Sequence, residues 1–396
     1  MKKSRLFIDD SHAAGTDLPE YLPSTDELVS CLSDIDPSVR SDAANAGTRE
    51  PTPAVPIFGQ PSRTADSVAT SGRKAACPRV SIVMAVHNGE TLIRKAIESA
   101  LAQTEQSLEL IVVDDGSTDG TRAAVDHYRK QDPRVRLIAG RTRRGPGHAR
   151  NRGIDAAKGE WIAVLDADDW YSKERLEILL AAADRHGASL LADNQLFVRD
   201  DGSRPHRRLI RASKGKPRRL TTSGLLRNDK IGRTGNFGLL KPIVRRQALI
   251  AHGIRYNEEI TLGEDFYFLL DCLRRMETLL LIPEPHYFYR IHRASISSSP
   301  AVETLIPMLK AQRVHTRQFD PALQPETRQL MHERTNDLER YIRYKTLMER
   351  LAFGDLRGAS ERIAKDPGTL FLLARGVARF LERQSAIYWA RFLTVL

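Results

Sequence analysis

The fold of this chain is limited most by a series of four short apolar runs. Each run ends in polar residues and is followed by a segment with the spacing of a helix. The runs cover residues 80–86, 108–113, 135–138 and 161–165. They are rich in β-branched residues, which is typical of strands buried on both faces of a sheet. Strands of this kind that alternate with helices predict an α/β fold, in which helices flank a mostly parallel sheet.

The intervening segments predict the flanking helices. Residues 90–103 carry apolar side chains three and four positions apart, which is the spacing of an amphipathic helix. Similar patterns predict helices over 119–130, around 154–157 and over 174–186.

Polar side chains gather where the predicted strands end, and in parallel sheets ligands bind beyond these carboxyl ends. Carboxylates in such a place are suited to Mg²⁺ or Mn²⁺. An ordinary turn or a helix cap is the alternative for each acidic residue. The residues concerned are His87, Asp114, Asp115, Asp166, Asp168 and Asp169.

Four motifs in a fixed order make this chain resemble the family 2 glycosyltransferases. They are Ala-Val-His-Asn-Gly from residue 85, Ile-Val-Val-Asp-Asp-Gly-Ser-Thr-Asp-Gly-Thr from 111, Ala-Arg-Asn-Arg-Gly-Ile from 149 and Gly-Glu-Trp-Ile-Ala-Val-Leu-Asp-Ala-Asp-Asp from 159. The resemblance is specific over residues 78–170 and extends more loosely to about residue 300. It implies a GT-A fold, which is Rossmann-like, and an inverting enzyme that uses a nucleotide sugar.

The resemblance also implies roles for residues on the donor side. In the family, the turns after the first two strands hold the nucleotide, which implies that Val86 and His87 contact the base. Asp115, with Asp114 nearby, would bind uracil or ribose. Arg150 belongs to an element that lies near the nucleotide sugar in the family.

The family's Asp-x-Asp motif falls on Asp166 and Asp168. It implies that Asp168 is the principal ligand of Mg²⁺ or Mn²⁺ and that Asp166 serves ribose and metal together. A later segment, residues 287–297, resembles the family's closing Tyr-Arg-x-His…Ser element. It implies a diphosphate contact for Arg290 or His292 and a metal contact for His292, with a solvent-facing or capping role as the open alternative.

Gly263-Glu264-Asp265 resembles the element that supplies the family's catalytic base. An inverting displacement needs one carboxylate to take the acceptor's proton, and Asp265 is the first choice, with Glu264 as the alternative. Acidic residues that open a helix also interact favourably with its dipole, which would explain both residues without catalysis.

The chain divides by composition into a tail, a catalytic domain and a helical C-terminal region. Residues 1–77 lack a sustained period and are expected to be disordered. Residues 78–300 form the expected GT-A domain, and residues 301–396 the helical region. Its last segment, 370–396, is amphipathic and cationic, which suits either a membrane surface or packing against protein.

Charge and cysteine content bear on partners and location. The chain carries 61 Lys and Arg against 50 Asp and Glu; removing the 8 and 11 of residues 1–77 leaves 53 against 39, or +14, for the rest. Residues 204–219 alone contain eight cations, so an anionic partner is expected. With three cysteines, no long apolar span and no pattern of a signal peptide, we expect a cytoplasmic protein, peripheral at the inner membrane.

The function expected from the resemblance is transfer of one sugar, glucose from UDP-glucose, to a lipid-linked glycan on undecaprenyl diphosphate. The most similar members build bacterial exopolysaccharide of the succinoglycan type. A Gln-x-x-Arg-Trp motif of processive synthases is absent, which favours single addition. The alternatives are lipopolysaccharide or capsule synthesis, or a non-catalytic GT-A-like protein that binds carbohydrate or nucleotide. Nucleic acid is not expected as a partner, because acidic strand ends repel phosphate.

Overall fold

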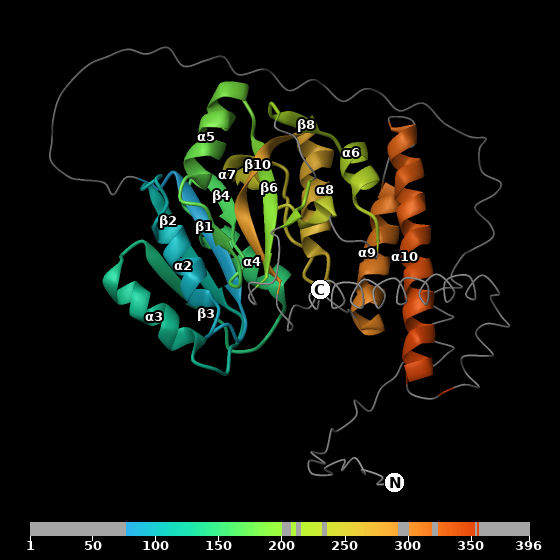
Figure 1. Cartoon of the computed structure of the whole chain (residues 1–396), viewed down its shortest axis with the longest axis horizontal. Coiled ribbons are helices and arrows are strands. Elements are labelled where there is room, and N and C mark those ends of the chain that lie inside the picture. Colours follow the sequence, from blue (N-terminus) through green and yellow to red (C-terminus); the bar gives the residue numbers. More distant parts are fainter. Residues whose placement is uncertain are drawn as a thin grey trace, which may run out of the picture. The chain divides into compact units, whose positions relative to one another are not determined.

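The computed structural model describes residues 77–199, 207–210, 215–231, 236–291, 301–318, 324–352 and 355. Residues 1–76 of the predicted tail, His292 and the segment 370–396 lie outside these residues. Within them the strands join one mixed sheet (Figure 1). They are β1 (Val80–Val86), β2 (Leu108–Asp114), β3 (Val135–Ala139), β4 (Trp161–Val164), β5 (Trp170–Tyr171), β6 (Leu190–Arg199), β7 (Arg207–Arg208), β8 (Arg218–Leu220), β9 (Ile243–Arg245) and β10 (Leu279–Ile291).

The strand order is β3-β2-β1-β4-β9-β6-β10-β5, with β7 paired to β6 and β8 to β10. The first four strands of this order are parallel, as are β6 and β10. Strand β9 is antiparallel to both of its neighbours. This confirms the predicted α/β fold, with a parallel half followed by a mixed half.

Helices cover both faces of the parallel half. Alternate residues of β1, among them Ile82 and Met84, pack into one core with α2, α3 and α5. Val83 points to the other face, where it lies against Gly153 of α4. The apolar runs are continuous because both faces are covered. The helices are α2 (Ile93–Leu101), α3 (Thr121–Gln131), α4 (Pro146–Ala156) and α5 (Arg175–His186).

The register brings three strand ends to one edge of the sheet. Val86 lies beside Asp114, and Val83 lies beside Val164. Residues that follow β1, β2 and β4 therefore emerge next to one another, although they are far apart in sequence.

The acidic residues after β4 do not cap a helix. A two-residue strand, β5, follows them at Trp170 and pairs with Phe288 of β10. Helix α5 begins only at Arg175. The capping alternative for Asp168 and Asp169 is therefore wrong.

The second half of the chain adds helices beside the mixed part of the sheet. They are α6 (Thr222–Asn228), η2 (Phe237–Leu239), α7 (Arg246–Ala251), α8 (Glu264–Met276), α9 (Val302–Gln318) and α10 (Pro325–Ala352). Figure 1 shows α9 and α10 side by side, next to α6 and α8. Helix α10 begins at Pro325, since proline is well tolerated in a first helical turn.

Side chains fix the C-terminal helices to α8 and to the end of α6. Arg334 of α10 pairs with Asp229 and stacks on Phe266, with both charged groups buried. The Tyr267 hydroxyl donates to the carbonyl of Met308 in α9 at 2.9 Å. None of the described helices is long and apolar enough to cross a membrane. The proposed domain boundary at residue 300 stays a prediction.

Candidate active site

The ends of β1 and β2 are joined by hydrogen bonds around Asp115. Its N–H donates to the carbonyl of Val86 at 2.8 Å, and its own carbonyl lies 2.9 Å from Nδ1 of His87. Its carboxylate accepts from the N–H groups of Arg144 at 2.9 Å and Gly145 at 2.7 Å. Asp115 therefore fixes the loop before α4 to the edge of the sheet, beside Val86 and His87.

Asp114 is fully buried and turns away from this group. One carboxylate oxygen accepts from Nε of Arg122 at 2.6 Å, and the other from the N–H of Ser117 at 3.1 Å. Its side chain holds the turn and the start of α3, which is the structural role that the sequence left open.

Arg150 of α4 gathers three carboxylates from distant parts of the chain. It donates to Oε1 of Glu264 and to Oδ1 of Asp166, both at 2.7 Å. Its Nη1 also lies 3.7 Å from Oδ1 of Asp265, and its side chain is only 5% exposed. The two candidates for the catalytic base, Glu264 and Asp265, stand in the first turn of α8. They thus lie beside Asp166, which was predicted to serve the donor side.

A second buried cation, Lys241, was missed by the sequence analysis. Its Nζ lies 2.6 Å from Oδ2 of Asp166 and bonds Oδ2 of Asp265. The signal was weak, since a lysine simply interrupts the apolar residues around Leu240 and Ile243 before a short strand. Lys241 matches no motif quoted above, yet it links Asp166 and Asp265 directly.

The charges of this group shift one another's pKa values. Burial works against ionisation of Asp166, but Lys241 and Arg150 outweigh it and hold its pKa well below the usual range. Burial raises the pKa of Glu264, helped by Asp265 and partly offset by Arg150. Burial opposes the charge of Lys241 too, yet the two carboxylates that it contacts raise its pKa well above the usual value.

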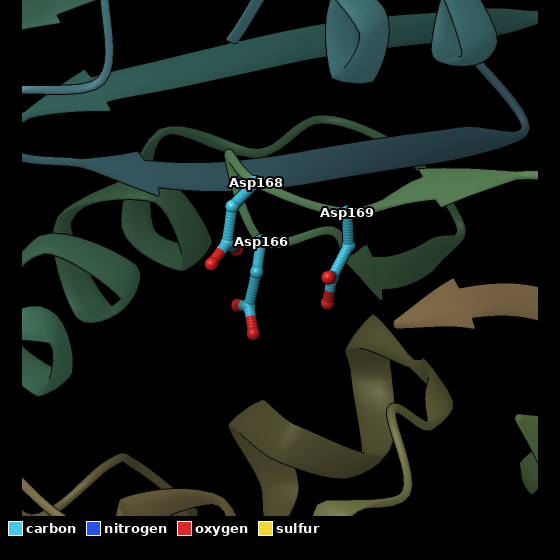
Figure 2. Close-up of side chains that lie close together, drawn as sticks. All are labelled: Asp166, Asp168 and Asp169. Atoms are coloured by element: carbon cyan, nitrogen blue, oxygen red, sulfur yellow. The ribbon is translucent and has the colours of Figure 1, made fainter. Parts of the chain in front are cut away.

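The acidic loop after β4 brings carboxylate oxygens of Asp166, Asp168 and Asp169 within 4.8 Å of one another. Figure 2 shows the three side chains pointing to the same side of the loop. Asp169 is buried, and its carboxylate accepts from the Tyr287 hydroxyl at 2.7 Å and from the N–H of Arg290 at 2.8 Å. Burial and the charges of Asp168 and Asp166 raise its pKa well above the usual value.

These contacts decide which residues fit a divalent cation. Asp169 is engaged with β10 and shapes the loop, whereas Asp168 is only partly buried. Asp166 would have to share its oxygens with Arg150 and Lys241. The hard oxygen donors of Asp168 and Asp166 suit Mg²⁺ or Mn²⁺. Nε of Arg290 donates to the Asp168 carbonyl at 2.8 Å, so Arg290 lies at this loop; its contact with the diphosphate stays a prediction.

A buried ion pair between Arg175 and Asp193 supports the backbone at Lys241. Arg175 bonds Asp193 through Nε at 2.9 Å, and both side chains are fully buried. Its Nη2 donates to the carbonyl of Lys241 at 2.8 Å, and its guanidinium lies 4.2 Å from the ring centroid of Tyr171. Arg175 therefore anchors the backbone that carries Lys241.

Comparisons with known proteins identify the family of the chain. The family model described as glycosyl transferase family 2 matches residues 81–246. Succinoglycan biosynthesis protein ExoO of Rhizobium meliloti is 36% identical over 310 residues, which are 78% of this chain and 88% of ExoO. Succinoglycan biosynthesis protein ExoU of the same organism is 32% identical over 244 residues, 60% of this chain and 70% of ExoU.

A solved structure supports the fold. TarS of S. aureus in complex with UDP superposes with a TM-score of 0.51 at 21% identity, over 64% of this chain and 70% of that one. A likeness at this identity concerns the fold alone, and the extent of the match to ExoO decides the family. The chain belongs to glycosyl transferase family 2 and is a glycosyltransferase.

Proposed function

We propose that this enzyme transfers a single sugar from a UDP-sugar, with inversion, to a lipid-linked glycan during bacterial exopolysaccharide synthesis. One observation carries the proposal. The acidic loop after β4 and the carboxylate pair at the start of α8 are joined through Arg150 and Lys241 into one buried group. The proposed donor and base residues are thus connected through a shared cation.

The nucleoside would bind at the ends of β1 and β2. Val86 and His87 lie there side by side in the chain, and Asp115 holds the facing loop. Asp114 would act through the turn that it supports. Arg290 lies at the acidic loop and would supply positive charge to the diphosphate.

Asp168 and Asp166 would hold Mg²⁺ or Mn²⁺, with His292 as the further ligand implied by the family resemblance. When bound, the cation would supply positive charge against the diphosphate as it leaves. The protein's own cations Arg150 and Lys241 keep Asp166 ionised for this role, since they lower its pKa.

Asp265 would act as the base, with Glu264 as the alternative. In the displacement, the acceptor oxygen forms a bond to the anomeric carbon and its proton passes to the carboxylate. The bond from that carbon to the diphosphate breaks, and UDP leaves with the electron pair. Asp265 is favoured because its Oδ1 is buried without a hydrogen bond, whereas Oε1 of Glu264 is bonded to Arg150.

The donor sugar, acceptor and location are supported less directly. The names of ExoO and ExoU concern succinoglycan, which favours UDP-glucose and an acceptor on undecaprenyl diphosphate at the inner face of the membrane. Described residues of the basic segment 204–219 lie at two positions on the sheet. Arg207 pairs beside Phe197 near the site end of β6, and Arg218 lies beside Leu281, toward the opposite end of β10. Only the first of these would face an anionic acceptor at the site.

The test is release of UDP from UDP-glucose, UDP-galactose and UDP-N-acetylglucosamine, with membrane lipid extract as acceptor. We expect Mn²⁺- or Mg²⁺-dependent release that lipid extract stimulates. Asp265→Asn should lower the rate by about 10²–10⁴-fold, because a positioned base contributes that much. Asp168→Ala should abolish the dependence on metal.

Asp155→Asn is the matched control, because Asp155 is exposed and forms only a surface ion pair with Arg255. It should keep the rate of the wild type. Wild-type silence with all three donors, together with UDP binding that Asp168→Ala leaves unaltered, would contradict the proposal and favour a non-catalytic binding protein.

A further inference from the structure

We infer that Lys241 is the positioning residue of the base: it fixes one oxygen of Asp265 so that the other, Oδ1, receives the acceptor's proton. This assignment rests on the proposed function and adds to it a residue and an atom. No motif in the sequence pointed to Lys241, and the family resemblance quoted above assigns it no role.

The two oxygens of Asp265 have different surroundings. Oδ2 is bonded to the ammonium of Lys241. Oδ1 is buried and has no hydrogen-bond partner, and Nη1 of Arg150 lies 3.7 Å away from it. A buried carboxylate oxygen without a partner costs free energy, so it is expected to be retained where a ligand completes it. An acceptor hydroxyl is the donor that the proposed reaction brings to this place.

Lys241 is held firmly enough to orient a carboxylate. Its side chain is 3% exposed. Its carbonyl accepts from Arg175, which is itself paired with the fully buried Asp193. Strand β9 begins two residues later, at Ile243. Because the backbone is anchored on both sides, the ammonium stays between Asp166 and Asp265.

The charges explain what a neutral residue at position 241 would do. Lys241 is shared by Asp166 and Asp265, and Arg150 is shared by Asp166 and Glu264. Without Lys241, Asp166 keeps its bond to Arg150, whereas Asp265 loses its only hydrogen-bonded cation among the described residues. The loss should therefore be much larger for the base than for the donor side, where Arg150 still pairs with Asp166.

The experiment compares Lys241→Met with the wild type, alone and in an Asp265→Asn background. Transfer is followed as UDP release from the best of the three UDP-sugars, and binding of UDP with Mn²⁺ is measured by calorimetry. We expect Lys241→Met to lower kcat by about 10²-fold, in the range that a positioned base contributes. The dissociation constant of UDP should change by less than about threefold. In the Asp265→Asn background, the Lys241→Met substitution should lower kcat by less than about threefold, because the effects of residues that act as a unit are not additive.

Three further variants control the result. Lys158→Met makes the same substitution at an exposed residue before β4, and it should leave kcat and UDP binding unchanged. Lys241→Arg keeps the charge and should recover at least about a tenth of the wild-type rate. Lys241→Gln keeps a hydrogen-bond donor and should lose less than Lys241→Met, so it tests the assignment even if the methionine variant does not fold.

Three results would overturn the assignment. Equal loss of kcat in both backgrounds would show that Lys241 acts independently of Asp265, and weakened UDP binding in proportion to kcat would place it on the donor side. Full activity of folded Lys241→Met or Lys241→Gln would do the same. A wild type that turns over no nucleotide sugar would instead contradict the proposed function, and this assignment with it.

Discussion

At the scale of residues, the site depends on cations that each serve two carboxylates. Arg150 and Lys241 lie between Asp166 and the pair that opens α8, and all of these side chains are largely buried. Removing one partner of a buried ion pair typically costs about 3–5 kcal/mol, because the other charge is left uncompensated. The protein therefore gains a fixed arrangement of charges that depends on every member being present.

A different carboxylate, Glu109, offers a test of residue-level electrostatics away from the site. Burial alone would raise its pKa, but hydrogen bonds from Ser81 and the N–H of Lys158, with Arg136, outweigh it and hold the pKa below its usual value. A lowered folded-state pKa means that this stabilisation is complete above the unfolded pKa of about 4.3. It is lost as the pH falls through the folded value.

Glu109→Gln should therefore reduce the free energy of unfolding at pH 7 by about 1–3 kcal/mol, the worth of charge-assisted hydrogen bonds. Its stability should also fall less steeply than that of the wild type as the pH drops below 4.5. Urea unfolding across this range measures both effects, and Glu177→Gln on the exposed side of α5 is the control. Parallel stability curves for wild type and Glu109→Gln would contradict the argument.

Sequence reasoning identified most charged members of the site but not their connections. Asp166, Glu264 and Asp265 stand in recognisable motifs, so they could be singled out from the sequence. Lys241 has no motif, because its role follows from the fold that brings β9 beside β4. The direction of Asp114 also depends on a tertiary contact, its pairing with Arg122.

At the scale of elements, α4 connects the sheet to the site. Its inner face packs on β1 and β2, and its first turn lies against the loop before α8. Asn151 of α4 exchanges hydrogen bonds with the backbone of Tyr256 at 2.9 Å. Arg150 stacks over the ring of the same tyrosine, 5.1 Å from its centroid. The position of Arg150 therefore depends on how closely α4 approaches this loop.

Gly147 permits this approach, and Gly147→Ala tests it. A Cβ at residue 147 would lie 2.7 Å from the backbone oxygen of Asn257, so helix or loop must shift. Overpacking of this kind costs about 1–3 kcal/mol of stability. We expect that loss in urea unfolding, together with a lower kcat for UDP release, because Arg150 would move with the helix.

The control for this variant is Asp155→Ala, in the last turn of α4. It removes only a surface ion pair with Arg255, which is worth about 0–1 kcal/mol. If Gly147→Ala were as stable and active as this control, the close approach of α4 would not position Arg150.

The elements themselves were predictable to different degrees. The strands β1, β2 and β3 lie within one residue of the predicted runs, because short apolar runs rich in β-branched residues favour a strand over a helix. Short strands such as β5 and β9 carry no period of their own and are formed by pairing with neighbours. The antiparallel part of the sheet therefore could not be predicted from local sequence.

At the scale of the whole molecule, the described C-terminal helices α9 and α10 pack against α8 and the end of α6. The buried pair of Arg334 and Asp229 joins α10 to the end of α6, and Arg334 also covers Phe266, the residue after the proposed base. His315 of α9 lies 3.3 Å from Asp271 of α8. Composition predicted a helical region here, but only tertiary contacts could reveal that it supports α8.

The proposed reaction is a single displacement at a site where the proposed donor and base residues share two cations. The most direct measurement is the anomeric configuration of the product, made from UDP-glucose labelled with ¹³C at the anomeric carbon and read by NMR in the lipid extract. Because the donor is α-linked, we expect a β-linked product with wild type, formed about 10²–10⁴-fold more slowly by Asp265→Asn. An α-linked product, or a β-linked product formed equally well by Asp265→Asn, would contradict the proposed reaction.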